Sequence, residues 1–144
     1  MVVSKTTCNI YSIIVIMTVM DNTIFENFVI KNRKIETFSV LLNRLREEKG
    51  LTPQELYKKA FIDRKLYSQI MGKRNYQPSK NTVIAFGLAL QLPYENFKIF
   101  LQSAGFSLNH NTEFDLVIKY CIQNKIYDIL TVNNYLEKKE LRCL

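Results

Sequence analysis

The stretch from Leu51 to Asn75 constrains the fold more than any other part of the chain, because it predicts two short helices joined by a tight corner. Thr52 and Glu55 fit a T-x-x-E capping box, in which each side chain satisfies a free backbone N–H at the start of a helix. Pro53 stands at the first helical position, where its missing N–H costs nothing. The first helix is therefore predicted to begin here.

The second helix follows almost directly. The helical spacing of the first one ends near Ala60, and Asp63 can cap a second helix that runs to about Met71 and is ended by Gly72. Two helices with so short a connection must cross at a steep angle, which is the helix-turn-helix arrangement.

With its flanking segments, this run resembles the Cro/repressor (XRE-like) type of helix-turn-helix domain, the lambda-repressor-like fold. The first part of that pattern is matched by Leu41, Leu42, Leu45, Arg46, Lys49, Gly50, Leu51 and Thr52. The middle and the end are matched by Ala60, Ile62, Tyr67, Ser68, Ile70, Gly72, Pro78, Ser79 and Thr82. The resemblance implies an all-α fold, with a compact five-helix bundle over residues 36–106. Its motif core is expected at Leu45, Leu56, Ala60, Ile62, Tyr67 and Ile70.

Apolar residues at helical spacing predict the other helices, at about 36–49, 80–91, 94–104, 114–123 and 127–138. The helix at 80–91 is apolar nearly all round and is expected to be the buried centre of the bundle. Residues 107–144 form a C-terminal extension of one or two additional helices. The apolar stripe of this extension must be covered either by the domain itself or by a second copy, as in a homodimer.

The chain is basic, with a net charge of +7 and a sequence pI near 9.3. Such a balance suits an anionic partner, either nucleic acid or, less readily, a membrane surface, although a soluble protein can also simply be basic. Between Lys58 and Lys80 there is one acid, Asp63, and seven cations: Lys58, Lys59, Arg64, Lys65, Lys73, Arg74 and Lys80. A charge run of this kind is usually a solvated face, but here it coincides with the surface that the resembled family presents to DNA.

The resemblance therefore implies double-stranded DNA as the partner and transcription regulation as the function. The candidates for reading bases are Arg64, Lys65 and Ser68, which point outward if Ile62, Tyr67 and Ile70 point inward. The candidates for binding phosphates are Lys73, Arg74, Lys80 and Ser79.

Several positions depart from the family pattern. Pro53 replaces a common Gln that touches phosphate, and Phe61 replaces the usual Gly at the corner. A left-handed backbone is costly for Phe, so the corner is expected to differ in geometry. Leu66 and Tyr67 are bulkier than usual, and the loop after Gly72 is about two residues longer. These departures keep open an alternative function, a protein-interaction or assembly module that does not read DNA.

The residue types speak against an enzyme. The sequence shows no nucleophile–base set, no metal-ligand spacing and no glycine-rich phosphate loop, so no catalytic residue, metal, cofactor or small-molecule ligand is predicted. Cys8, Cys121 and Cys143 are far apart and odd in number, which indicates neither a disulfide framework nor zinc. A reducing, cytoplasmic setting is expected, with Cys121 as a small buried hydrophobe.

Residues 1–35 are the least defined segment. The run Ile10–Met20 is strongly apolar but too short for a membrane-spanning helix, so no membrane partner is predicted. A buried strand, a core helix, or a natural start at Met17 or Met20 all remain open. A secretory signal is disfavoured because no small-residue cleavage pattern follows. Residues 21–34 are expected to be an irregular lead-in that ends in Lys31, Arg33 and Lys34.

Overall fold

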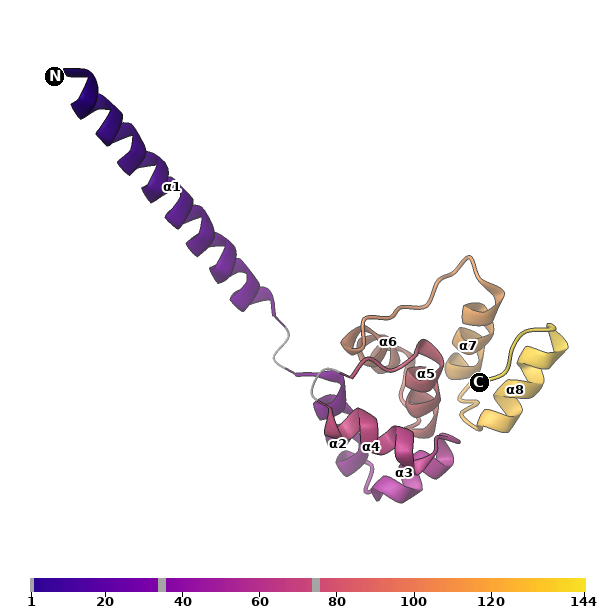
Figure 1. Ribbon diagram of the computed structural model, residues 1–144. Helices are drawn as coiled ribbons and strands as arrows, with labels where there is room; N and C mark the ends of the chain where they lie inside the picture. The colour runs from indigo at the N-terminus through magenta and orange to yellow at the C-terminus, as the bar shows by residue number, and fades with distance from the viewer. Residues whose placement is uncertain (1, 34–35, 74–75) are drawn as a thin grey trace. The chain divides into compact units, whose positions relative to one another are not determined.

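The computed structural model describes residues 2–33, 36–73 and 76–144, and in these ranges all regular secondary structure is helical (Figure 1). The all-α prediction is confirmed. Two compact units are present, Met1–Ile35 and Glu36–Leu144. The first contains α1 (Val2–Asn32), and the second contains α2 (Phe38–Glu48), α3 (Pro53–Lys59), α4 (Arg64–Gly72), α5 (Lys80–Ala89), α6 (Tyr94–Ser103), α7 (Glu113–Gln123) and α8 (Ile129–Lys138).

Helix α1 overturns what the sequence predicted for the N-terminal segment. It continues without a break to Asn32, so the irregular lead-in is wrong up to that residue, while Lys34 lies outside the described residues. All side chains described from Ile10 to Arg33 are exposed, so neither a buried strand nor a buried core helix is present there. The segment Ile10–Asn32 is long and apolar enough, by length and composition, to cross a bilayer.

Side chains cap five of the helix starts in the second unit. Thr52 and Glu55 form both bonds of the predicted capping box. The predicted caps Asp63 and Ser79 likewise accept hydrogen bonds from backbone N–H groups of α4 and α5. Thr37 caps α2 and Asp128 caps α8 in the same way, at positions for which the sequence analysis proposed no cap.

Six helices in the second unit end in the same backbone motif, a residue with positive φ that lets two N–H groups bond back to the last turn. The positive-φ residues are Gly50, Phe61, Gln91, Gly105, Lys125 and Glu140. Each is followed by an apolar residue that packs on or in the core: Leu51, Ile62, Leu92, Phe106, Ile126 and Leu141. Only two of the six ends use glycine, although glycine adopts this conformation most easily.

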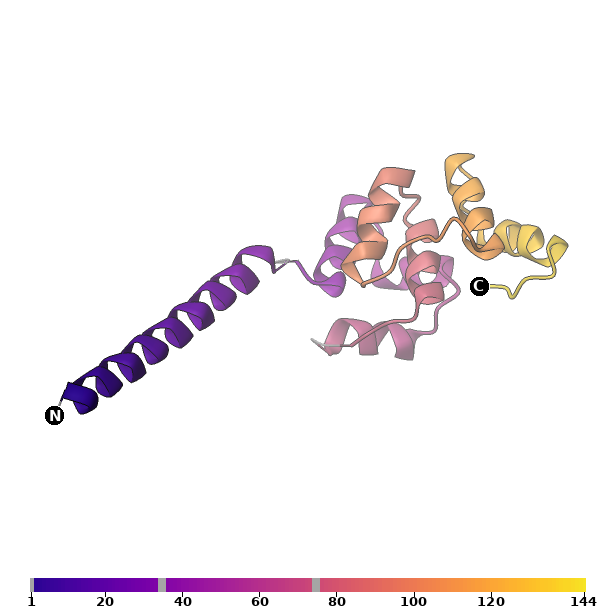
Figure 2. The same ribbon diagram turned by 90° about the horizontal axis from the view of Figure 1, so that it is seen from above.

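The core of the second unit is built around α5, which Figure 2 shows among the other helices of that unit. Every residue from Thr82 to Ala89 is buried, as predicted. Ile118 and Cys121 of α7 and Val132 of α8 are fully buried in the same core as the residues of α2–α6. Cys121 is thus the buried small hydrophobe that was predicted, and burial raises the pKa of its thiol. The unit itself covers the inner face of the C-terminal extension.

Candidate nucleic-acid interface

The α3–α4 pair is held by local bonds at its corner. The N–H of Ile62 donates to the Tyr57 carbonyl at 2.9 Å, and the N–H of Phe61 donates to the Lys58 carbonyl at 3.1 Å. Asp63 then caps α4 through the N–H of Leu66 at 2.6 Å. These bonds fix where α3 ends and α4 begins, so the side chains of α4 project in set directions.

The inner face of α4 packs on the rest of the unit. Tyr67 and Ile70 are buried, and the Tyr67 ring lies 5.6 Å from Tyr57 and 6.1 Å from Phe86, centroid to centroid. Burial raises the pKa of the Tyr67 hydroxyl, an effect that neighbouring Arg46 opposes. Of the other expected motif core, Leu56 and Ala60 are buried, while Leu45 and Ile62 are half-buried against the core.

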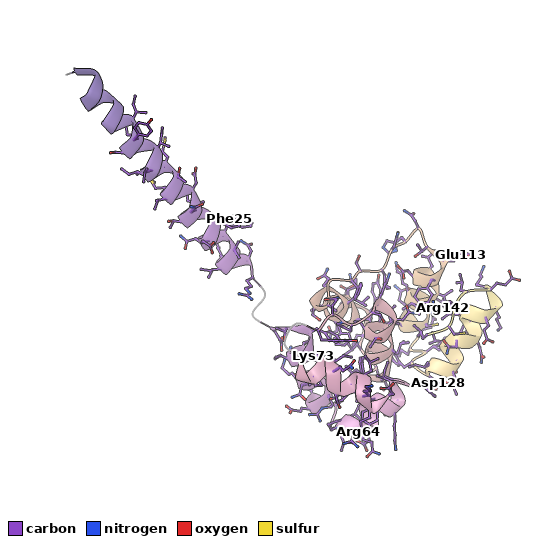
Figure 3. The ribbon with its side chains drawn as sticks, in the orientation of Figure 1. Phe25, Arg64, Lys73, Glu113, Asp128 and Arg142 are labelled. Atoms are coloured by element: carbon purple, nitrogen blue, oxygen red, sulfur yellow. The ribbon has the colours of Figure 1, made fainter. Side chains whose placement is uncertain are left out.

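The outer face carries the three residues predicted to read bases. Arg64, Lys65 and Ser68 are all exposed. Within the described ranges, none of their side chains takes part in an ion pair or a hydrogen bond with another residue. Figure 3 labels Arg64 and Lys73, which lie at opposite ends of α4. The side chains on this face are therefore available to an anionic partner.

A shallow hollow lies between the first turns of α3 and α4. Its volume is about 560 Å³, and it is lined by Thr52, Pro53, Gln54, Tyr57, Arg64, Tyr67 and Ser68. Gln54 was not among the residues predicted from the sequence; it is exposed one residue after Pro53, next to the position where the resembled family often has Gln. A glutamine one residue after the family position was the sequence signal that could have identified Gln54. The Gln54 side chain of α3 and the Arg64 side chain of α4 therefore line the same hollow.

The predicted phosphate-binding residues have different surroundings. Lys73 is exposed at the end of α4, and Ser79 is exposed at the start of α5, where its hydroxyl caps the helix. Arg74 lies outside the described residues. The Lys80 ammonium is instead 2.7 Å from a carboxylate oxygen of Asp115, which is only 3% exposed and also accepts the N–H of Asn109 at 2.6 Å. Lys80, predicted to bind phosphate, is thus paired with an acid of α7 that lies far along the chain.

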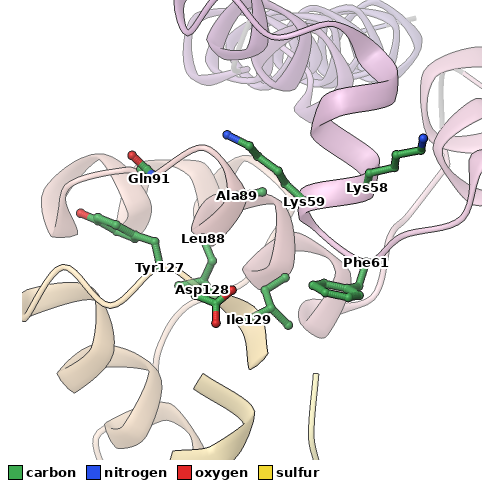
Figure 4. A pocket seen from close by; sticks show the side chains of 9 residues that line it. All are labelled: Lys58, Lys59, Phe61, Leu88, Ala89, Gln91, Tyr127, Asp128 and Ile129. Carbon is green, nitrogen blue, oxygen red and sulfur yellow. The ribbon is translucent and has the colours of Figure 1, made fainter. Parts of the chain in front are cut away.

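The corner residue Phe61 has φ = +53°, so the expectation that this corner avoids a left-handed backbone is wrong. The conformation costs a residue with a Cβ about 1–2 kcal/mol. The Phe61 side chain is 63% exposed and lines a second hollow, of about 440 Å³. Figure 4 shows this hollow with Phe61, Lys58 and Lys59 on one side and Tyr127, Asp128 and Ile129 on the other.

We expect the free energy of unfolding to be about 1 kcal/mol higher for Phe61→Gly than for Phe61→Ala. Both variants lose the ring, but only glycine adopts the left-handed backbone conformation without steric cost. Urea titration followed by circular dichroism would measure the difference. Equal stability of the two variants would contradict a strained corner.

A third surface lies on the outer side of α7 and α8. It is a mostly apolar hollow of about 410 Å³ lined by Glu113, Leu116, Val117, Tyr120, Tyr135, Lys138 and Lys139. The rings of Tyr120 and Tyr135 meet edge to face at 5.6 Å, and the Lys138 ammonium lies 5.3 Å from the Tyr135 ring centre. The outer face of the extension thus combines apolar area with cations.

Comparisons with known proteins add no family to this description: no protein-family model, no curated protein and no solved structure matches the chain. Among the residues that the structure describes, no group of three or more His, Cys, Asp or Glu side chains could hold a metal ion. The arrangement on α3 and α4 is therefore interpreted from its own geometry and charge.

Proposed function

We propose that residues 36–144 form a sequence-specific, double-stranded DNA-binding transcription regulator of the Cro/repressor type. In this proposal α2–α6 make the five-helix, lambda-repressor-like bundle, and α7 and α8 are additions. The observation that carries the proposal is the outer face of α4, where Arg64, Lys65 and Ser68 are exposed and have no side-chain partner among the described residues, while the opposite face is buried. A helix braced in this way can enter the major groove with its first turns toward the base edges.

The division of labour follows from the chemistry of each side chain. Arg64 or Lys65 would donate hydrogen bonds to guanine O6 and N7, and Ser68 to a base or a phosphate. Lys73, at the other end of α4, would bind phosphate as a flexible point charge. The Gln54 amide, across the hollow from Arg64, would bind the phosphate next to the groove and fix the register. This set needs no metal, no cofactor and no catalytic residue.

Two copies would allow the protein to read two half-sites about one helical turn apart. We propose that the outer face of α7 and α8 is the contact between the copies, because its mostly apolar hollow is left uncovered by the rest of the unit. The proposed setting is the cytoplasm, where a DNA-binding regulator has access to its target.

We expect the double variant Arg64→Ala and Lys65→Ala to bind duplex DNA at least about 10-fold more weakly at low salt, because it loses both cations of the first turn of α4 that would contact DNA. The slope of log affinity against log salt should fall by about 1–2, since each phosphate contact contributes roughly 0.9 to it. Fluorescence anisotropy at two salt concentrations, with selected and random duplexes, would measure both quantities.

The matched control is the double variant Lys125→Ala and Arg142→Ala, which removes the same charge after the ends of α7 and α8 and outside the α7–α8 hollow. It should retain the affinity and most of the salt slope. An unaltered chain that binds no duplex at low salt would refute the proposal. Equal affinity for selected and random duplexes would reduce it to nonspecific binding.

A second function, an assembly module that does not read DNA, is favoured by one observation, the apolar hollow on α7 and α8. Leu116→Glu places a charge in that hollow and tests whether it is a contact surface, while DNA binding by the unaltered chain distinguishes the two functions. The assembly module is the better description under two conditions. The unaltered chain must bind no DNA, and sedimentation must show that Leu116→Glu abolishes self-association or the binding of a partner.

A further inference from the structure

We propose that α1 inserts into a lipid bilayer and anchors the chain to it. The first observation is length: a helix of 31 residues is about 46 Å long, against roughly 30 Å for the hydrocarbon core of a membrane. The run Ile10–Met20 alone is too short to span a membrane. The continuous helix removes that limit, because the charge-free stretch from Thr6 to Met20 is longer than this run and is part of a helix that continues to Asn32.

The second observation is how the apolar side chains are distributed around α1. The five consecutive residues from Ile13 to Met17 are all large, apolar and between 49% and 61% exposed. Successive residues of a helix step by about 100°, so these five cover its whole circumference. A partner protein usually contacts one stripe of a helix, whereas lipid surrounds it. Uniform apolar exposure therefore favours a bilayer over a protein groove.

The third observation is the placement of charge. The sequence has no charged residue from Thr6 to Met20, a stretch that rises about 22 Å as helix. A charge-free stretch somewhat shorter than the bilayer is accommodated by local thinning of the bilayer. Asp21 and Glu26 follow this stretch, so one membrane interface would lie near them.

The flanking cations set the orientation. Lys31, Arg33 and Lys34 follow the apolar segment in the sequence, and only Lys5 precedes it. Cations next to a membrane helix stay on the cytoplasmic side, so residues 36–144 would remain in the cytoplasm. The anchor does not depend on the proposed DNA binding, and either can fail without the other.

The test is flotation of the full chain, synthesised without cells in the presence of phosphatidylcholine vesicles. These vesicles carry no net charge, so the net charge of +7 cannot by itself hold the chain to them. We expect the chain to float with the vesicles and to stay bound through high-salt and alkaline carbonate washes. The double variant Ile14→Asp and Ile16→Asp should lower the partition coefficient by at least about 100-fold, because each buried charge opposes insertion.

The control is Ile99→Asp with Leu130→Asp, which adds the same charges at exposed apolar positions of α6 and α8. It should float like the unaltered chain. The proposal is overturned if the unaltered chain stays soluble and does not float, or if the Ile14/Ile16 variant floats equally well. It is also overturned if lipid-free chains associate through α1, or if the chain recovered from cells has lost α1 as a cleaved leader.

Discussion

Replacing Asp115 with Ala is expected to lower the free energy of unfolding by about 3 kcal/mol, because it breaks a buried ion pair and leaves its partners unsatisfied. The Asp115 carboxylate accepts from the Lys80 ammonium at 2.7 Å and from the Asn109 N–H at 2.6 Å. Lys80 is 29% exposed and can regain some water, which places the loss at the lower end for such pairs. Urea unfolding followed by circular dichroism would measure it.

Glu113→Ala is the matched control, since Glu113 also lies in the first turn of α7 and contributes similarly to the helix dipole. Its side chain is exposed and its distance to Lys139 is 4.0 Å, so we expect a loss of only a few tenths of a kcal/mol. Similar losses for Asp115→Ala and Glu113→Ala would contradict a structural role for the ion pair.

A double-mutant cycle separates the ion pair from the backbone bond. Lys80→Ala removes only the ammonium, and the Asp115→Ala and Lys80→Ala double variant should lose less stability than the sum of the two single variants. Additive losses would show that the Asn109 N–H accounts for the effect of Asp115. The same Lys80→Ala variant should leave DNA affinity nearly unchanged if Asp115 keeps the ammonium from phosphate.

Gly87→Ala is expected to destabilise the protein by about 2 kcal/mol, although alanine is the better helix former by about 1 kcal/mol. Gly87 lies inside α5, and a Cβ there would overlap the ring of Phe97, with 2.6 Å to its Cδ2 atom. Phe97 is fully buried, so the ring has no room to move away. Overpacking should therefore outweigh helix propensity, which thermal and urea unfolding can measure.

Gly72→Ala is expected to have the opposite effect on the free energy of unfolding of the same protein. Gly72 is also helical, and a Cβ there meets nothing within 4 Å, so this variant should gain up to about 1 kcal/mol. Phe97→Leu should reduce the cost of Gly87→Ala, because it removes the ring that the new methyl group meets. A cost that persists in the Phe97→Leu background would point to another cause.

Most of the second unit could be predicted from the sequence, because the start of each of its helices is determined by residues close together in the chain. Thr52, Asp63 and Ser79 each cap the helix that follows, and a cap needs only the next three residues. Several helix ends were harder to predict, since Phe61 and Lys125 adopt the left-handed conformation without being glycine. There the apolar residue that follows, Ile62 or Ile126, is the better signal, because it packs against the core.

Two parts of the chain could not be predicted, for different physical reasons. The polar residues after Met20 suggested a break, but the sequence has no Gly or Pro before Gly50, so nothing interrupts α1. The partner of Lys80 is 35 residues away on α7, and no local pattern shows which buried acid a cation will reach. The exposed positions of Arg64, Lys65 and Ser68, by contrast, followed from the period of one short amphipathic helix.

The shared core has a practical consequence for anyone who trims this protein. A fragment that ends after Phe106 would expose the apolar core residues against which Ile118, Val132 and Leu136 pack. Such a fragment would aggregate or unfold. A negative result with it in a binding assay would therefore not report on the intact chain.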